Sequence, residues 1–356
     1  MDEEKKYPEE FVNALIEGGW LSMLIPEQYG GLGMGMIEAA TVLEEINRSG
    51  GLAAPAHAQM YTMGAVLRHG TAKQKETWLP AIASGKLRLQ AFGVTEPAAG
   101  SDTTNIKTFA ERKDGIYRIN GEKIFTSRVQ HSDLMLVLVR TTPREKVQRK
   151  TDGITLLLLD LNAQKAHIRV KPIPTMINHE TNEVFFEDAE VPVENRIGEE
   201  GQGFRCVISG LNAERILVAS GSIGDGRYFV DKSTSYANSR VVFGRPIGQN
   251  QGIQFPIAKA HISLEAASLV RDHAARLFDL GEEGGAYANM AKYLAATAAW
   301  EAANAAMDTF GGYGYAVEYN IERKFREARL TMVAPVSNNL ILSHVAEHVL
   351  GMPRSY

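Results

Sequence analysis

The chain has 356 residues, of which 44% are hydrophobic, and a formal net charge of −4. This length and composition support a sizeable core in one to three domains, and the charge balance excludes the basic surface typical of nucleic-acid-binding proteins. The single cysteine, Cys206, excludes a disulfide framework within the chain and is typical of a reducing compartment. No apolar run approaches the roughly 18 residues that a membrane span needs.

The N-terminal third is predicted to be helical. The first residues, MDEEKKYPEE, are acidic and polar, unlike a secretory signal or a mitochondrial transit peptide, so we expect a cytoplasmic protein. Thr71, followed three residues later by Gln74, is typical of a helix start. Apolar residues recur at helical spacing in EEFVNALIEGGW (9–20), MIEAATVLEEINRSG (36–50) and TAKQKETWLPAIASG (71–85).

From about residue 89 to 198 the pattern is that of strands and turns. The turn signals are KDG, NGE and TDG. Strands are predicted at LQAFGVT (89–95), YRINGEKIFTS (117–127), DLMLVLVRT (133–141), GITLLLLDL (153–161), IRVKPI (168–173) and NEVFFEDAEVP (182–192).

The remainder is again helical, with helices predicted at 203–239, 249–280, 286–309 and 336–350. Helix, sheet and helix in this order predict a mainly helical α+β fold, with a sheet domain between two helical ones. The expected domains are an N-terminal helical domain (1–88), a middle β domain (89–200) and a C-terminal helical domain (201–356).

The segment LNAERILVAS places one carboxylate inside an apolar helical run. Glu214 is three residues from both Leu211 and Leu217, so on an α-helix it points the way they do, toward the core. Desolvation disfavours the charged form of a carboxylate, which makes it a stronger proton acceptor and suits a general base. The alternative is a salt bridge at the edge of the core, with Arg215 as its partner.

Three loop segments combine small residues with groups that bind ligands. Residues 92–102 leave a strand through a turn of small residues, which either lets backbone N–H groups approach a ligand or is an ordinary tight turn. Residues 308–315 place three glycines among aromatic residues, which either admits a flat ligand or ends a helix. Residues 240–248 offer a cation beside an aromatic ring, although connections between helices often carry charge.

Together these segments resemble the acyl-CoA dehydrogenase family over nearly the whole chain. GVTEPAAGSD (93–102) is similar to the first family signature and DTFGGYGYAVEYNIERKFRE (308–327) to the second. RVVFGRPIGQNQGIQF (240–255) is similar to the Arg-x-x-Phe-Gly flavin segment of the family. IPEQYGGLG (25–33) resembles a segment in the N-terminal part of family members. Asn105 departs from the usual small residue, and the chain starts about one helix late.

The resemblance implies a β-barrel-like middle domain, a C-terminal four-helix bundle and FAD bound in a homotetramer, or dimer of dimers. It also implies an acyl-CoA substrate, an electron-transfer flavoprotein as acceptor, and no metal. Phe125 replaces the usual Trp of the flavin-covering segment, and Asp308 replaces the Gln of many relatives. The residues implied to bind FAD are Phe92, Val94, Thr95, Gly100, Ser101, Phe125, Thr126, Ser127, Arg240, Phe243, Gln251, Asp308, Gly311, Gly312, Ser337 and Asn339; those implied to contact CoA are Ser101, Thr141, Asn212 and Arg215.

The usual catalytic base is missing. Many family members carry it as the Glu of a Tyr-Glu-Gly-Thr segment, and here Pro335 occupies that position, in Ala-Pro-Val-Ser. Proline cannot accept a proton. In a minority of relatives, which resemble isovaleryl-CoA and long-chain dehydrogenases, the base lies on a helix after the sheet domain, beside the Arg of a similar Glu-Arg pair. That position here is Glu214, the predicted base for α,β-dehydrogenation of an acyl-CoA to the trans-2-enoyl-CoA.

Two other functions remain open from the sequence. The absence of the usual Glu favours a relative that uses oxygen, such as a flavin monooxygenase or a nitroalkane oxidase, whereas Glu214 and the CoA-contact positions count against it. The chain is alternatively a catalytically silent flavoprotein or a subunit of a larger complex, in which Glu214 is structural. Small residues at Ala98, Ala334 and Val336 favour a branched or bulky acyl group.

Overall fold

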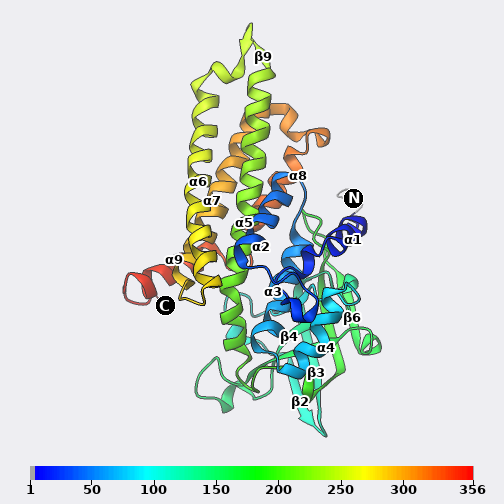
Figure 1. Cartoon of the computed structure of the whole chain (residues 1–356). Helices are drawn as coiled ribbons and strands as arrows, with labels where there is room; N and C mark the ends of the chain where they lie inside the picture. The colour runs from blue at the N-terminus through cyan, green and yellow to red at the C-terminus, as the bar shows by residue number, and fades with distance from the viewer. Residues whose placement is uncertain (1–4, 356) are drawn as a thin grey trace. The chain divides into compact units, whose positions relative to one another are not determined.

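The computed structural model describes residues 5–355, so the first four residues of the polar N-terminal stretch lie outside the described part (Figure 1). The predicted succession of helices, a sheet and helices is confirmed. Two compact units form: the chain up to Met34 with Ala54–Leu211, and Gly35–Ala53 with Asn212–Tyr356.

The helices of the first unit are α1 (Glu9–Glu17), α3 (Ala54–His69) and α4 (Ala72–Ala83). The predicted start of α4 is confirmed, because the Thr71 hydroxyl accepts from the Gln74 N–H at 3.2 Å and the Gln74 side chain accepts from the Thr71 N–H at 2.8 Å. Helix α3 was not among the predicted helices. Most of its residues are buried, so the polar face by which an amphipathic helix is detected is weak.

The sheet of the first unit has the strand order β6-β7-β3-β2-β4-β5-β8, and β1 pairs with β4 in parallel. Alternate residues of β4 and β5 enter two cores: Leu136 and Leu158 pack with residues of α3 and α4, whereas Val137 and Leu157 pack among other strands. The strands are β1 (Ala91–Gly93), β2 (Phe109–Lys113), β3 (Ile116–Ser127), β4 (Leu134–Arg140), β5 (Ile154–Asp160), β6 (Ile168–Pro172), β7 (Thr181–Pro192) and β8 (Arg196–Ile197).

The prediction of a turn at Asn-Gly-Glu is wrong, because Gly121 lies inside β3. The register between β3 and β7 shifts between Ile119 and Gly121, which marks a β-bulge. Gly121 has a φ of 141°, and a Cβ there would lie 2.7 Å from the Thr108 Cα. Glycine is therefore required at this position because the Thr108 backbone lies close to it within the sheet, and not because the chain reverses there.

The second unit consists mainly of long helices. Three predicted helices are confirmed as α5 (Gly203–Ser239, which begins in the first unit), α6 (Gln251–Asp279) and α7 (Gly285–Phe310). The predicted helix 336–350 is instead α9 (Asn338–His344) followed by a π-helical turn, Val345–Val349. Helices α2 (Met36–Arg48) and α8 (Ile321–Leu330) complete the unit, and α8 had not been predicted.

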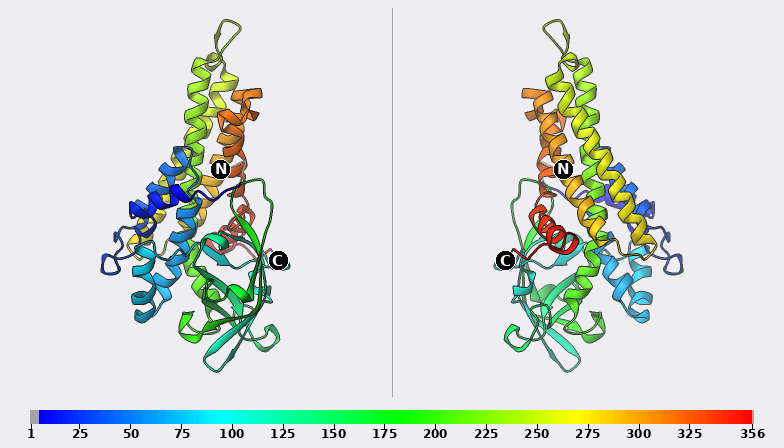
Figure 2. Two further views of the ribbon diagram at one scale, coloured as in Figure 1. Left: turned by 90° about the vertical axis from the view of Figure 1, so that its right-hand side faces the viewer. Right: turned by 90° about the vertical axis from the view of Figure 1, so that its left-hand side faces the viewer.

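Helices α5, α6, α7 and α8 share one core, and small residues let them approach closely. A Cβ on Gly226 of α5 would lie 2.3 Å from Leu264 of α6, and one on Gly224 would lie 2.2 Å from the Glu44 carbonyl oxygen of α2. Figure 2 shows α5 and α6 side by side, with the hairpin of β9 (Val241–Val242) and β10 (Arg245–Pro246) projecting beyond their ends.

An ion cluster is buried inside this bundle. Lys324 of α8 is fully buried, forms an ion pair with Asp225 of α5 and another with Glu327 at 3.1 Å, and donates to the Gly51 carbonyl at 2.9 Å. Burial raises the pKa of Asp225 to about 6, although Lys324 acts to lower it. The buried, desolvated charges of this cluster connect α5, α8 and the segment after α2.

Candidate functional site

The turn after β1 belongs to the first unit and exposes one row of predicted ligand-binding residues. Ala91 and Gly93 are buried, whereas Phe92, Val94 and Thr95 are partly exposed, as the two-residue period of a strand requires. Phe92 also contacts an aromatic residue of α3, with its ring centroid 6.1 Å from that of Tyr61. Gly100 and Ser101 are exposed at the end of the turn.

A buried carboxylate that had not been singled out fastens this turn. Glu96 is 6% exposed and accepts from the Lys123 ammonium at 2.8 Å and the Thr108 N–H at 3.0 Å. Burial pushes the pKa of Glu96 upward, but Lys123 and the hydrogen bonds outweigh it and the pKa is lowered. Burial lowers the pKa of Lys123 to about 8. The turn after β1 is thus fixed to the sheet by the buried ion pair between Glu96 and Lys123.

The end of β3 presents an aromatic side chain to the outside. The pairing with β7 shifts between Lys123 and Thr126, and Phe125 within this irregularity has a φ of 58° and is 61% exposed. Ser127 is partly exposed, whereas Thr126 is 1% exposed and faces the interior. Phe125 and Ser127 are therefore available to a ligand through their side chains, and Thr126 only through its backbone.

Thr141, one of the four predicted CoA contacts, follows β4. Its hydroxyl lies 2.7 Å from that of Thr155, and its N–H donates to the Gly153 carbonyl at 2.9 Å. The Thr141 hydroxyl is therefore already hydrogen-bonded to a neighbouring strand of the sheet.

In the second unit, Glu214 has the orientation predicted from helical spacing. It is 2% exposed on α5. The neighbouring Arg215 donates to the Asn212 side chain at 3.1 Å, so two predicted CoA contacts are joined on one turn of the helix. Burial lowers the pKa of Arg215, and Glu214 partly offsets this. A buried carboxylate beside a constrained guanidinium is chemically suited to accept a proton from a bound ligand.

The segment between α8 and α9 contains Pro335, at the position where the resemblance places the usual catalytic Glu. Pro335 is exposed and follows a cis peptide bond. The predicted cofactor contact Ser337 caps α9, accepting from the Leu340 N–H at 3.4 Å, and Asn339 is exposed.

The fully buried Lys292 of α7 fastens this segment, and it had not been predicted to take part in the site. It donates to the Val336 carbonyl at 2.7 Å and to the Asn338 side chain at 2.9 Å. A sequence signal existed, because Lys292 is four residues from Ala288 and three from Ala295 in an otherwise apolar helical face.

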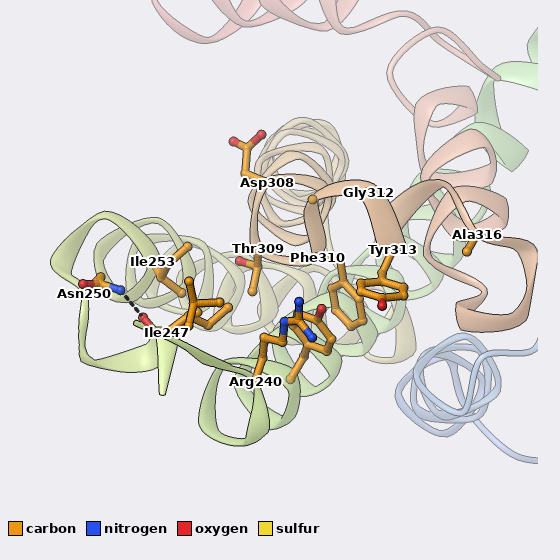
Figure 3. Close-up of a pocket in the computed structure, with 13 residues that line it drawn as sticks. Arg240, Ile247, Asn250, Ile253, Asp308, Thr309, Phe310, Gly312, Tyr313 and Ala316 are labelled. Carbon is orange, nitrogen blue, oxygen red and sulfur yellow. Dashed lines mark hydrogen bonds between the residues drawn. The ribbon is translucent and has the colours of Figure 1, made fainter. Parts of the chain in front are cut away.

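A pocket of about 640 Å³ brings together four of the predicted cofactor contacts in the second unit (Figure 3). Arg240 follows α5, with its guanidinium carbon 5.4 Å from the centre of the Tyr313 ring. In Figure 3 the Asp308 side chain points away from Arg240. The pocket is lined by Tyr236, Arg240, Val242, Ile247, Asn250, Ile253, Asp308, Thr309, Phe310, Gly311, Gly312, Tyr313 and Ala316.

The pocket suits a large ligand with anionic and flat parts. Gly311 has a φ of 55° and a ψ of −130°, a conformation open to glycine, and no atom lies within 4 Å of where a Cβ would stand on Gly311 or Gly312. Backbone and cation can therefore both approach a phosphate, beside an aromatic wall. Phe243 and Gln251 are outside the lining, on the hairpin and at the start of α6, and Phe243 is completely exposed.

None of the helices in the described part of the chain has the length and apolar character that a membrane crossing requires.

Comparison with known proteins identifies the family. The chain matches the N-terminal domain of acyl-CoA dehydrogenases over residues 1–86, their middle domain over 91–189 and their C-terminal domain over 201–350. Acyl-CoA dehydrogenase FadE12 of Mycobacterium tuberculosis is 36% identical over 343 residues, which cover 95% of this chain and 87% of the relative.

Solved structures agree with these matches. Butyryl-CoA dehydrogenase from Megasphaera elsdenii superposes with a TM-score of 0.92 at 30% identity, over 98% of this chain and 92% of that one. An FAD complex of PigA superposes with a TM-score of 0.91 at 25% identity, over 98% of this chain and 91% of that one. The glycine-backed pocket of the second unit, with its cation, fits a part of such a cofactor. The exposed aromatic ring of Phe125 in the first unit, taken by itself, is suited to cover a flat ring. The chain is therefore a member of the acyl-CoA dehydrogenase family, an oxidoreductase whose cofactor is FAD.

Proposed function

We propose that the protein is an acyl-CoA dehydrogenase in which Glu214 removes the α-proton of an acyl-CoA thioester, giving the trans-2-enoyl-CoA. One observation supports the proposal most strongly: of the two positions at which the resemblance places a catalytic base, one holds Glu214, 2% exposed on α5, and the other holds the exposed Pro335.

The residues of the chain carry the proton-transfer half of the reaction. A hydrogen-bonded thioester carbonyl makes the α-proton acidic enough for a desolvated carboxylate to remove it. Arg215 is a permanent cation next to Glu214 in sequence. Its hydrogen bond to Asn212 fixes both side chains for the CoA part of the substrate. FAD supplies a hydride acceptor for the β-carbon, and an electron-transfer flavoprotein is the expected next acceptor.

The surface of the second unit supports assembly into the expected homotetramer. Phe243 at the tip of the hairpin is completely exposed, and α6 exposes Phe255, Ile262 and Leu269 by 60%, 68% and 72%. These three residues are spaced seven apart, so they form one apolar stripe along the helix. A stripe of this kind on a soluble enzyme is typical of a surface that another copy covers. Arg240 and Phe243 would then reach the FAD of a neighbouring copy.

An anaerobic titration of the purified flavoprotein with a panel of acyl-CoAs tests the function. Bleaching of the oxidised flavin band at about 450 nm by one class of acyl-CoA is the expected result and identifies the substrate class. Small residues at Ala98, Ala334 and Val336 favour a branched or bulky acyl chain. If the flavin is present and no acyl-CoA bleaches it, the proposal is wrong, and oxygen chemistry or a silent subunit is the better account.

The variant Glu214→Gln tests the assignment of the base. It keeps the size and hydrogen-bonding shape of the side chain, so FAD content should not change, whereas the rate of flavin reduction should fall by about 10²–10⁴. Glu282→Gln, in the exposed connector between α6 and α7, is the matched control and should reduce at the wild-type rate. A wild-type rate in Glu214→Gln would remove this residue from the mechanism.

A further inference from the structure

Arg68, in the last turn of α3, carries a guanidinium group that lacks a partner in the described part of the chain. Its Nε and Nη2 are buried, neither has a hydrogen-bond partner there, and the side chain forms no ion pair with a described residue. An unpaired buried charge is costly, because the protein interior solvates it far less well than water does. Natural proteins keep such costs chiefly at functional sites, so the partner of Arg68 is to be sought in a ligand.

The titratable neighbours of Arg68 within residues 5–355 carry no negative charge. Burial lowers the pKa of Arg68, and the Cys206 thiol of α5 opposes this. Burial raises the pKa of that thiol, which is therefore uncharged near neutral pH. Burial, followed by Arg68, lowers the pKa of His69, whose Nε2 lies 2.6 Å from the Ser209 hydroxyl. These groups thus leave the guanidinium without a counter-charge.

Two glycines make room for the Arg68 guanidinium. A Cβ on Gly64 of α3 would lie 3.2 Å from both Nη1 and Nη2, and one on Gly210 of α5 would lie 2.9 Å from Nη2. A side chain at Gly210 would therefore have to displace the guanidinium. The cation thus lies between α3 and the early part of α5, inside the first unit.

The face of α3 that carries Arg68 also contacts the predicted flavin-binding turn. His57, Tyr61 and Arg68 are partly exposed on a mostly buried helix, and their spacings of four and seven residues place them on one face. The Tyr61 ring centre lies 5.0 Å from that of His57 and 6.1 Å from that of Phe92 in the turn. Seven residues of α-helix span about 10 Å, which is the distance along α3 from Tyr61 to Arg68. A ligand that reacts near Phe92 and extends along this face would reach Arg68.

We propose that Arg68 binds an oxyanion of the acyl-CoA ligand through Nε and Nη2. These two nitrogens form one edge of the guanidinium plane, and their parallel N–H groups match two oxygens of a carboxylate or a phosphate. The inference deepens the proposed function and rests on it, since it takes an acyl-CoA as the ligand. Two parts of such a ligand offer this chemistry: a carboxylate at the far end of the acyl group, and a phosphate of CoA.

Calorimetric titration of the FAD-loaded protein distinguishes these two sources. The probes are a straight-chain trans-2-enoyl-CoA, the same compound with a terminal carboxylate, and free CoA, none of which is a substrate for the proposed dehydrogenation. Arg68→Met should bind the probe that carries the recognised oxyanion about 10- to 100-fold more weakly. A loss confined to the carboxylated probe identifies the acyl carboxylate, and a loss for all three identifies a CoA phosphate. Wild-type affinity for all three, or a loss for both enoyl-CoAs without one for free CoA, would overturn the inference.

The stability of the ligand-free protein separates a binding role from a structural one. Arg68→Met removes an unpaired charge and keeps an apolar stem, so its midpoint of unfolding in denaturant should equal or exceed that of wild type. A clearly lower midpoint would show that the guanidinium stabilises the fold, contrary to the inference. Arg276→Met, at an exposed arginine of α6, is the matched control and should leave both the midpoint and the affinities unchanged.

A second variant tests the two-nitrogen contact. Arg68→Lys keeps the charge and loses the paired N–H groups, so it should bind the same probe more weakly than wild type; wild-type affinity would contradict the proposed contact. If no acyl-CoA bleaches the wild-type flavin, the proposed function fails, while the titrations and unfolding midpoints still decide the role of Arg68. If wild type is bleached and Arg68→Met binds every probe as wild type does, only the inference about Arg68 fails.

Discussion

The buried ion cluster of the helical bundle gives a quantitative prediction for Lys324→Met. The change removes the cation from Asp225 and Glu327, whose exposed fractions are 3% and 6%. It also removes the hydrogen bond to the Gly51 carbonyl at 2.9 Å. Breaking a buried ion pair from one side costs about 3–5 kcal/mol, so the free energy of unfolding should fall by about that amount near pH 7.5.

The loss should depend on pH, and the sign follows from Asp225. Its pKa is raised from 3.8 to about 6 in the folded protein, so the folded state binds the proton more tightly. The stabilisation from this proton is complete below about 3.8 and is lost as the pH rises through about 6. Without Lys324 the proton is held more tightly still, so acidification should restore part of the stability of the variant.

Chemical unfolding followed by far-ultraviolet circular dichroism at about pH 5 and 7.5 measures both effects. Lys259→Met is the matched control: Lys259 is 74% exposed and lies 3.9 Å from Glu301, so its loss should cost less than about 1 kcal/mol. Equal destabilisation of Lys324→Met at both pH values, or a loss under about 1 kcal/mol near neutrality, would refute the reasoning.

Three further variants test packing, assembly and cofactor binding. Gly224→Ala should lower the free energy of unfolding by about 1–3 kcal/mol in denaturant titrations, because the new Cβ meets the Glu44 carbonyl oxygen of α2 at 2.2 Å; wild-type stability would show that α2 and α5 separate easily. Phe243→Asp should shift the protein toward smaller species in light scattering without loss of helix signal, and an unchanged mass would exclude the hairpin from assembly. Arg240→Met should weaken FAD binding about tenfold in fluorescence titrations, since it removes the cation of the pocket; an unchanged affinity would place the phosphates elsewhere.

Local sequence patterns were sufficient where one periodicity dominates. The long helices follow the helical spacing of apolar residues, and the same spacing placed Glu214 on the buried face of α5. Local sequence patterns gave a wrong prediction where tertiary contacts determine the backbone conformation. Asn-Gly favours a turn locally, but the ladder between β3 and β7 keeps Gly121 in a strand.

The site residues that sequence reasoning missed are those whose partners are distant in the chain. Lys292 binds groups 44 and 46 residues away, and the Glu96 carboxylate meets Lys123, 27 residues on. No local pattern encodes such pairs. The pocket around Arg240 was foreseen only through the family resemblance, because it joins the end of α5 to the glycines after α7.

The alanines of α7 have a consequence for how this protein can change during evolution. Ala295, Ala299 and Ala303 are completely buried, so the helix fills its surroundings with backbone and methyl groups. Such side chains lose no rotamer freedom on folding, and any larger replacement there overpacks the bundle. We therefore expect the middle of α7 to tolerate fewer substitutions than its two ends, so that sequence change in this helix is confined to its ends.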